Sequence, residues 1–530
     1  MSAPAALSVR SIDNADDIER PGAIYRALGV EPIVNCAGVR TNYGGSNPSP
    51  EVLAAMASAA QAFVDLDELA EAVGRRLGEL TGAPWGVVTS GTAAALALAT
   101  AACIAGNDPE LMVRLPRMQG IANRVIMPAG QRFAYDSAIR MTGAEIVEVA
   151  SAEELAAALD DSVAMICILA RSDARSALPL RLIAPAARQH GIPALVDAAG
   201  LKPCERDPWL AQGADLVIYS GGKYLRGPQS TGLLLGAKHL CQAAWINGAP
   251  HQAFGRPMKV GKEEIVGAVV ALEHWIKHRD PQRDEEAWRR RLAIFADRLR
   301  ELPGVTTGVL PSGSSVSVPR LRISWNTGMS AEVLRVRLLG QTPPIVIHDF
   351  WSTASSIVVD PFNLSDTDAG VAADAIAAAL AAPGSAAPPP ALDVRHDVSG
   401  RWDVSIAFLH GRARHRLELV QSGRRLEGRH VARASRGVVS GSISGCVVTF
   451  QARHEASPMP LYYGFTGTVA DGCLRGELTV GACADEHNGP VFRGQFGAAT
   501  WQATATAPAA RDAHSRHAGD RSAAFAEGDS

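Results

Sequence analysis

The sequence predicts an α/β fold: a large domain with a mostly parallel sheet, a small α+β domain, and an additional C-terminal antiparallel all-β domain that resembles a barrel. Three observations support this. Short apolar runs alternate with helical patterns over residues 35–275, as in a parallel sheet covered by helices. A long helical pattern with fewer apolar runs follows over 276–385. Residues 394–506 then alternate between apolar and polar side chains, with glycines between the runs.

The apolar runs of the large domain are short and rich in Val, Ile and Leu, which predicts strands buried on both faces. Ala-rich helical patterns lie between them, for example over 151–159 and 180–190. Ligands of such sheets bind at the carboxyl ends of the strands, so the site is expected there. The predicted strands are GVVTS (86–90), RVIMPA (124–129), EIVEVA (145–150), VAMICILA (163–170), ALVDAAG (194–200), DLVIYSGG (215–222) and GLLLG (232–236).

The small domain of 276–385 includes the end of one long amphipathic helix, expected over about residues 262–302. The predicted strands that follow are near 305–309, 316–325 and 355–359, and the predicted helices are near 330–339 and 366–382.

Three segments lie outside these domains. Residues 1–34 are expected to form an N-terminal arm. The Pro- and Ala-rich segment 386–393 is typical of a linker. Residues 507–530 are small, polar and charged, which predicts a disordered tail.

Charge and cysteine content exclude several classes of protein. The net charge is −3, so no general attraction to nucleic acid or to an anionic membrane is expected. The eight cysteines are scattered without a C-x-x-C pair, which favours reduced thiols over disulfides or a metal site. The N-terminus lacks an apolar signal core, and the most apolar stretch, 93–105, is too short to span a bilayer. We therefore expect a cytoplasmic protein.

Lys223 follows a predicted strand and a Ser-Gly-Gly turn, Ser220 to Gly222. Burying an ammonium at such a place is unfavourable, and a lysine held there tends to be neutral, as a Schiff-base lysine must be. The glycines would let the backbone approach a bulky ligand. A solvated lysine in a β-α turn is the alternative, and the tetrapeptide alone does not decide between them.

Asp197 ends the predicted strand ALVD and lies one β-α-β unit before Lys223. A carboxylate and an amine on neighbouring strands could surround pyridoxal phosphate (PLP), whose aldehyde binds the amine and whose pyridine nitrogen needs a carboxylate. Ala199 is small enough for a flat ring to rest on it. Asp197 could instead cap a helix or bind magnesium.

The third motif is Thr89-Ser90-Gly91-Thr92-Ala93, which links a predicted strand to an Ala-rich helix. Backbone N–H groups and hydroxyls at a helix N-terminus form an anion site that suits a phosphate. An ordinary Ser/Thr helix cap is the alternative. A phosphate motif, a carboxylate and a lysine occur in this order, each directly after a predicted strand. All three together arise by chance less often than any one of them alone.

These motifs resemble the fold-type I PLP-dependent enzymes of the selenocysteine synthase-like group, within it the family of D-glucosaminate-6-phosphate ammonia-lyase. The resemblance covers about residues 20–385. It is carried by VNCAGVRTNYGGSNPSPEVLAAM (34–56), TSGTAAA (89–95), AYDSAIRMTGAEIVEV (134–149), LVDAAG (195–200), GADLVIYSGGKYLRGPQSTGLLLG (213–236) and GRPMKVGKEEIVGAVVALE (255–273).

The resemblance implies that Lys223 binds PLP covalently and that Asp197 pairs with the pyridine nitrogen. The phosphate would be held by Ser90, Gly91, Thr92 and Ser220. Residues implied near the mouth of the site, where they could bind an anionic substrate, are Arg226, Arg256 and Lys259, with Arg320 and Arg322 as candidates for the substrate carboxylate.

One position departs from the family pattern. A histidine that stacks on the cofactor ring in the family is replaced by Gln131, so either the Gln131 amide covers the ring or the substrate differs.

The predicted function is a PLP-dependent lyase that removes the α-proton of an amino acid or amino-sugar acid and eliminates a β-substituent, giving ammonia and a 2-keto acid. The alternatives are a selenium or sulfur transferase acting on seryl-tRNA, a racemase or aldolase, and a binding or regulatory module without catalysis. A homodimer or larger homo-oligomer is implied by the resemblance. The exact substrate, the leaving group and the role of the barrel stay open.

Overall fold

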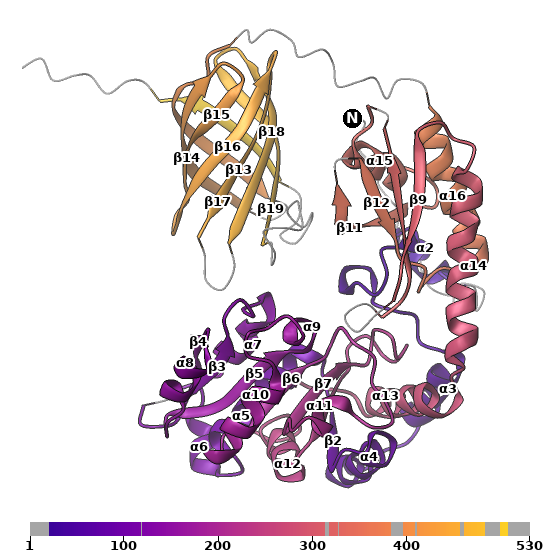
Figure 1. Cartoon of the computed structure of the whole chain (residues 1–530), viewed down its shortest axis with the longest axis vertical. Helices are drawn as coiled ribbons and strands as arrows, with labels where there is room; N and C mark the ends of the chain where they lie inside the picture. Colours follow the sequence, from indigo (N-terminus) through magenta and orange to yellow (C-terminus); the bar gives the residue numbers. More distant parts are fainter. Residues whose placement is uncertain are drawn as a thin grey trace, which may run out of the picture. The chain divides into compact units, whose positions relative to one another are not determined.

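The computed structural model describes most of the chain in two compact units, the second being the C-terminal barrel (Figure 1). The described residues are 21–117, 119–312, 317–326, 328–353, 355–382, 396–408, 411–455, 460–482 and 499–506. The predicted linker and tail lie outside them, as do the first twenty residues of the predicted arm. None of the described helices combines the length and apolarity needed to cross a bilayer.

The large domain is built on a seven-stranded sheet in which six strands are parallel and β8 runs antiparallel to both neighbours. All seven strands occur where the sequence predicts them. In spatial order they are β2 (Trp85–Thr89), β8 (Gly232–Gly236), β7 (Leu216–Ser220), β6 (Ala194–Asp197), β5 (Val163–Leu169), β3 (Arg124–Pro128) and β4 (Glu145–Val149).

Successive residues of these strands enter two separate apolar clusters, one on each face of the sheet. Ile126 packs on the face covered by α4, α10 and α13, whereas Val125 and Met127 pack on the face covered by α5 and α12. Burial on both faces explains why the strands are continuous apolar runs. The helices of this domain are α3 (Pro50–Ala60), α4 (Leu66–Thr81), α5 (Thr92–Ala105), α6 (Pro109–Arg114), α7 (Ser137–Arg140), α8 (Ala152–Ala158), α9 (Ala170–Asp173), α10 (Leu180–Gln189), α11 (Pro208–Ala211), α12 (Lys238–Ile246) and α13 (Lys262–Glu273).

The small domain has a five-stranded sheet in the order β1 (Val34–Cys36), β11 (Ile345–Thr353), β12 (Ser356–Val359), β10 (Arg320–Trp325) and β9 (Val305–Leu310). Two of these strands, β1 and β11, are absent from the sequence prediction. The predicted boundary at residues 34–35 falls inside β1, which follows the short helix α2 (Ala23–Ala27) and pairs in parallel with β11. A three-residue strand has too few residues for a period, and its partner is distant in the chain.

The single helix predicted over 262–302 is wrong, because the structure divides it. A π-helical turn, His274–His278, follows α13, and the chain leaves the helical conformation at Arg279 before α14 (Pro281–Leu299). Asp280 caps α14 by accepting hydrogen bonds from two backbone N–H groups. Pro281 has no N–H to donate, so it suits a first helical turn and not a helix interior.

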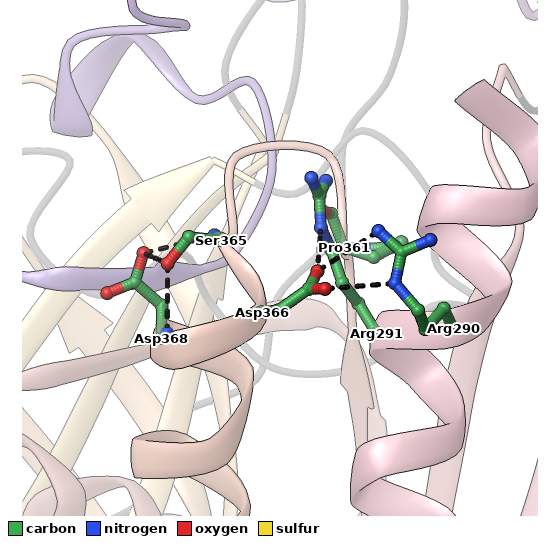
Figure 2. A network of polar contacts seen from close by, with 6 residues as sticks. All are labelled: Arg290, Arg291, Pro361, Ser365, Asp366 and Asp368. Carbon is green, nitrogen blue, oxygen red and sulfur yellow. Dashed lines mark hydrogen bonds and ion pairs between the residues drawn. The ribbon is translucent and has the colours of Figure 1, made fainter. Parts of the chain in front are cut away.

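The helices α14 and α16 (Asp366–Ala381) pack together on the small sheet, beside α15 (Ala331–Leu339). Figure 2 shows the polar contacts that join them. Asp366 accepts from Nε of Arg290 at 2.9 Å and from Nε of Arg291 at 3.2 Å. Beside it, Ser365 and Asp368 form a reciprocal capping box at the start of α16. Asp366 is half exposed, so these ion pairs add little energy and mainly fix the position of the helix.

The C-terminal domain is a closed barrel of eight strands, which confirms the predicted antiparallel all-β architecture. Along each strand, buried apolar residues alternate with exposed polar ones, because successive side chains point to opposite faces. Trp402, Trp501 and Tyr463 belong to the interior of the barrel. The strands are β13 (Gly400–Phe408), β14 (Gly411–Ser422), β15 (Arg425–Val431), β16 (Arg436–Ser444), β17 (Val447–His454), β18 (Leu461–Ala470), β19 (Cys473–Ala482) and β20 (Ala499–Ala505).

Three buried histidines form a hydrogen-bonded chain inside the barrel. Nδ1 of His415 lies 3.0 Å from Nε2 of His430, and Nδ1 of His430 lies 2.8 Å from Nε2 of His454. The chain ends at Ser435, whose Oγ lies 2.7 Å from Nδ1 of His454. Tyr463 packs its ring against all three imidazoles. Burial, with a smaller contribution from the two neighbouring imidazoles, lowers the pKa of His430 to about 2.

This lowered pKa predicts an acid-sensitive barrel. Below about pH 6.5 the unfolded chain binds a proton at His430 and the folded chain does not, so the free energy of unfolding falls by about 1.4 kcal/mol per pH unit for this group. His430→Gln keeps a donor and an acceptor but removes the titration. In calorimetry of the full chain between pH 7.5 and 5.5, the variant should lose less stability than the wild type. His239→Gln, at an exposed position, is the control, and equal pH dependence in wild type and His430→Gln would refute the assignment.

Candidate active site

The predicted site residues gather at one edge of the seven-stranded sheet. Because β2, β5, β6 and β7 are parallel, their carboxyl ends share this edge, and the antiparallel β8 begins there. Gly232 at the start of β8 pairs with Thr89 of β2 on one side and with Ser220 of β7 on the other. This register places the predicted phosphate motif one strand away from the segment that leads to Lys223.

Two glycines bring Lys223 to this edge. A Cβ on Gly221 would collide with Oγ1 of Thr231, and a Cβ on Gly222 would collide with the Cα of Gln229. The segment therefore needs residues without side chains in order to close against 229–231. The backbone of Lys223 is held from another part of the chain, because the hydroxyl of Ser46 donates to its carbonyl oxygen at 2.6 Å.

Lys223 and Asp197 form an electrostatically coupled pair. Burial lowers the pKa of Lys223, and the charge of Asp197 opposes this shift. Burial also raises the pKa of Asp197, against the hydrogen bond that Oδ1 accepts from the N–H of Ala199 at 2.9 Å and the charge of Lys223. Both shifts favour the neutral forms, as expected when a cation and an anion lose water together. An amine with a lowered pKa is a nucleophile and a base at neutral pH.

The N-terminus of α5 has the features of an anion site. The helix begins at Thr92 after Gly91, which has φ 90°, and no side chain caps it. Ser90 and Thr92 therefore do not satisfy the first N–H groups, as they would in the ordinary helix cap considered above. The hydroxyl of Thr89 donates to the carbonyl oxygen of Gly91 at 2.9 Å and orients the turn. A Cβ on Gly232 would lie 2.6 Å from the carbonyl carbon of Gly91, so the two glycines pass in close contact.

Gln131 is buried beside the same edge. Its Oε1 accepts from the backbone N–H of Leu169, at the end of β5, at 2.7 Å. Its Nε2 is also buried and has no hydrogen-bond partner among the described residues. A buried donor without a partner is unfavourable unless a bound group completes it. Ala199 lies two residues after Asp197, in a turn that the Asp197 carboxylate holds.

The arginines expected to bind substrate differ in their surroundings. Arg226 has φ 54° and donates from Nε to the carbonyl oxygen of Asn47 at 3.0 Å, so part of its guanidinium supports the backbone. Arg320 is buried in an ion pair with Asp360 at 2.8 Å, which gives it a structural role. The side chains of Arg256, Lys259 and Arg322 are exposed, and no hydrogen bond or ion pair joins them to Lys223 within the described residues.

Two arginines near the site were not predicted. Arg171, in α9 directly after β5, lowers the pKa of both Lys223 and Asp197 through its charge. Arg40 also lowers the pKa of Lys223. The sequence did offer one signal for Arg171, because it is a charged residue just after the carboxyl end of a buried strand. Arg40 lies in the loop after β1, a strand that the sequence prediction missed.

The glycine turn gives a direct test of this geometry. Gly222→Ala should lower the thermal midpoint of the full chain and weaken PLP binding, because the new methyl group overlaps the backbone of Gln229 and overpacking destabilises by about 1–3 kcal/mol. Gly200→Ala is a matched control in the turn after β6, since a Cβ there has no heavy atom within 4 Å. Equal melting and PLP binding in Gly222→Ala and wild type would contradict the described turn.

Comparison with known proteins gives three relevant similarities. Residues 68–250 match the model of the Cys/Met metabolism PLP-dependent enzymes. The chain is 33% identical to 5'-C-glycyluridine monooxygenase-decarboxylase from Streptomyces sp, over 64% of this chain and 88% of that protein. It is 31% identical to D-glucosaminate-6-phosphate ammonia lyase from Salmonella typhimurium, over 65% of this chain and 94% of that protein.

A solved structure of D-glucosaminate-6-phosphate ammonia-lyase superposes with a TM-score of 0.60 and 28% sequence identity. The superposition covers 67% of this chain and 98% of that structure.

Proposed function

The chain belongs to the PLP-dependent enzymes, in the family that includes D-glucosaminate-6-phosphate ammonia lyase, and from this membership we propose that it is an ammonia-lyase acting on a small anionic amino acid or amino-sugar acid. The net reaction removes the α-proton and a β-hydroxyl as water. A second water then replaces the amino group by oxygen, which gives a 2-keto acid and ammonia. The observation that carries the proposal is the partly buried, electrostatically coupled pair Lys223 and Asp197 beside the uncapped N-terminus of α5.

The described residues fit PLP chemically. The uncapped helix N-terminus suits the phosphate, and the partly buried carboxylate of Asp197 suits the pyridinium nitrogen. The Nε2 of Gln131 is a buried donor that lacks a partner among the described residues. When bound, PLP supplies an electron sink that stabilises the carbanion left when the α-proton is removed. We assign its binding to Ser90, Gly91, Thr92, Gln131, Asp197, Ala199, Ser220 and Lys223.

Lys223 serves as covalent anchor and as base. Its lowered pKa increases the fraction of Nζ that is neutral, and a neutral Nζ would serve as the base that accepts the α-proton. The hydroxyl of Ser46 holds the main chain of Lys223, which limits the positions that Nζ reaches. Asp197 would pair with the cofactor nitrogen, and the N–H of Ala199, which donates to Oδ1, opposes the rise in the pKa of Asp197 that burial causes.

The anionic end of the substrate requires cations near the site. Arg171 and Arg40 are the arginines whose charge acts on Lys223, and they join Arg226, Arg256, Lys259 and Arg322 as substrate-binding candidates. A homodimer, implied by the resemblance, and a cytoplasmic location remain predictions.

A second candidate is an oxidative decarboxylation, favoured by the similarity to a monooxygenase-decarboxylase. It would use the same lysine and carboxylate but would release CO2 and consume O2, whereas the lyase keeps the α-carboxylate and needs no oxidant.

Lys223→Ala tests the anchor. The purified variant should lose the visible absorbance of bound PLP and all product formation, because no other amine replaces Nζ. Lys238→Ala, an exposed lysine of α12, should keep both. An unchanged absorbance spectrum and full turnover in Lys223→Ala would remove Lys223 from the proposed role.

The reaction type is tested by a screen of amino acids, amino-sugar acids and their phosphates against the holoenzyme. Ammonia and 2-keto acid are expected in a one-to-one ratio, with no oxygen consumed in an oxygen-electrode cell. Release of CO2 with uptake of O2 would favour the second candidate. Ammonia without a 2-keto acid would contradict both reactions.

A further inference from the structure

The buried polar side chains of the C-terminal barrel lie at one end of its interior. Most of its interior is filled by buried apolar side chains, including the stacked rings of Phe450 and Phe465 and the indole of Trp501. This packing is typical of small barrels whose side chains fill the interior. The buried histidine chain of His415, His430 and His454 is the exception. A ligand of this domain therefore needs a site at the polar end, where the histidines lie.

A cavity of about 510 Å³ lies at this end, and we call it the barrel notch. It exists because β15 stops at Val431, opposite Arg416, while β14 extends five residues further, from Gly411 to His415. The turn that joins β15 to β16 closes it, with the N–H of Ala432 donating to the carbonyl oxygen of Ser435. The residues of the barrel notch are Asp403, Arg414, His415, Arg416, Val431, Ala432, Arg433, Ala434, Ser435 and Arg436.

The charge of the barrel notch is strongly unbalanced. It contains four arginines and a single carboxylate, Asp403. None of the four has an ion-pair partner within the described residues. Elsewhere on the barrel, Arg401 pairs with Glu418, Arg425 with Glu427 and Arg453 with Glu455. Four arginines against one carboxylate give the notch an excess of positive charge, which a bound anion would offset.

Both ends of the histidine chain line the same notch. His415 is one end and Ser435 is the other. When the Ser435 hydroxyl donates to His454, each imidazole passes its hydrogen bond along the chain, and the Nε2–H of His415 is left as a donor. The chain thus leaves the Nε2–H of His415 as one neutral donor at the notch, while the proton of the Ser435 hydroxyl is donated to His454.

We propose that the barrel notch binds a small phosphate ester. Guanidinium forks bind phosphate through paired hydrogen bonds, and four of them supply more donors than one carboxylate accepts. The volume lies within the range of small-molecule sites and is too small for a folded nucleic acid. This site would be additional to the one at Lys223 and independent of its chemistry.

The test is calorimetric titration of the PLP-loaded full chain with glucose 6-phosphate and with pyrophosphate. Loading with PLP fills the proposed cofactor site, and the arginine variants of the notch distinguish binding there from binding at the proposed substrate site near Lys223. The double variant Arg416→Gln/Arg433→Gln should weaken binding of both probes by about tenfold or more. The matched control, Arg429→Gln/Arg475→Gln, removes the same charge from exposed barrel positions outside the notch and should bind within about twofold of wild type.

Circular dichroism and the thermal midpoint should be unchanged in both double variants, because all four arginines are exposed. Three results would overturn the proposal. The first is no binding of either phosphate probe to the wild type. The second is equal weakening by the control variant, which would mean general charge attraction. The third is binding of citrate or of a single-stranded RNA 20-mer, sensitive to Arg416→Gln/Arg433→Gln, without binding of the phosphates.

Discussion

The structure depends on placing an amine and a carboxylate together, away from water, at the carboxyl edge of a parallel sheet. Removing either charge from water is unfavourable, and the opposite shifts in the pKa of Lys223 and Asp197 express that energy. The fold tolerates it because β6 and β7 are adjacent and parallel, so that one register fixes both residues. A cofactor that bonds to the amine and pairs with the carboxylate satisfies both groups.

The same edge shows how backbone contacts make room for a ligand. Gly221 and Gly222 lie against 229–231, and Gly232 lies against Gly91. Side chains at these positions would separate the strand ends or fill the space above them. The uncapped N-terminus of α5 is then left with N–H groups that only a ligand or water can satisfy. The close backbone packing of these glycines therefore also creates the space in which a ligand could bind.

The barrel distributes its polar groups differently. Its interior is apolar except at the end that holds the three histidines, which remain neutral through burial. Their hydrogen bonds run along one chain from His415 to Ser435, so each of these three imidazoles has a partner. The four arginines of the barrel notch have no ion-pair partner among the described residues, whereas Arg401, Arg425 and Arg453 are paired elsewhere on the barrel.

The sequence by itself determined the seven strands of the large sheet, the antiparallel barrel, and the order of Ser90, Asp197 and Lys223. These features depend on local periodicity and on residues next to strand ends, which can be recognised without the tertiary structure. Only the tertiary structure decided the break at Pro281, the pairing of β1 with β11 and the position of Arg171. It also decided that Arg320 forms a buried ion pair with Asp360. In the same way it decided that three histidines far apart in the barrel sequence form one hydrogen-bonded chain. Lys223 was identifiable early because its turn is local. The histidine chain was not, because it depends on strand register, which joins residues that no sequence period connects.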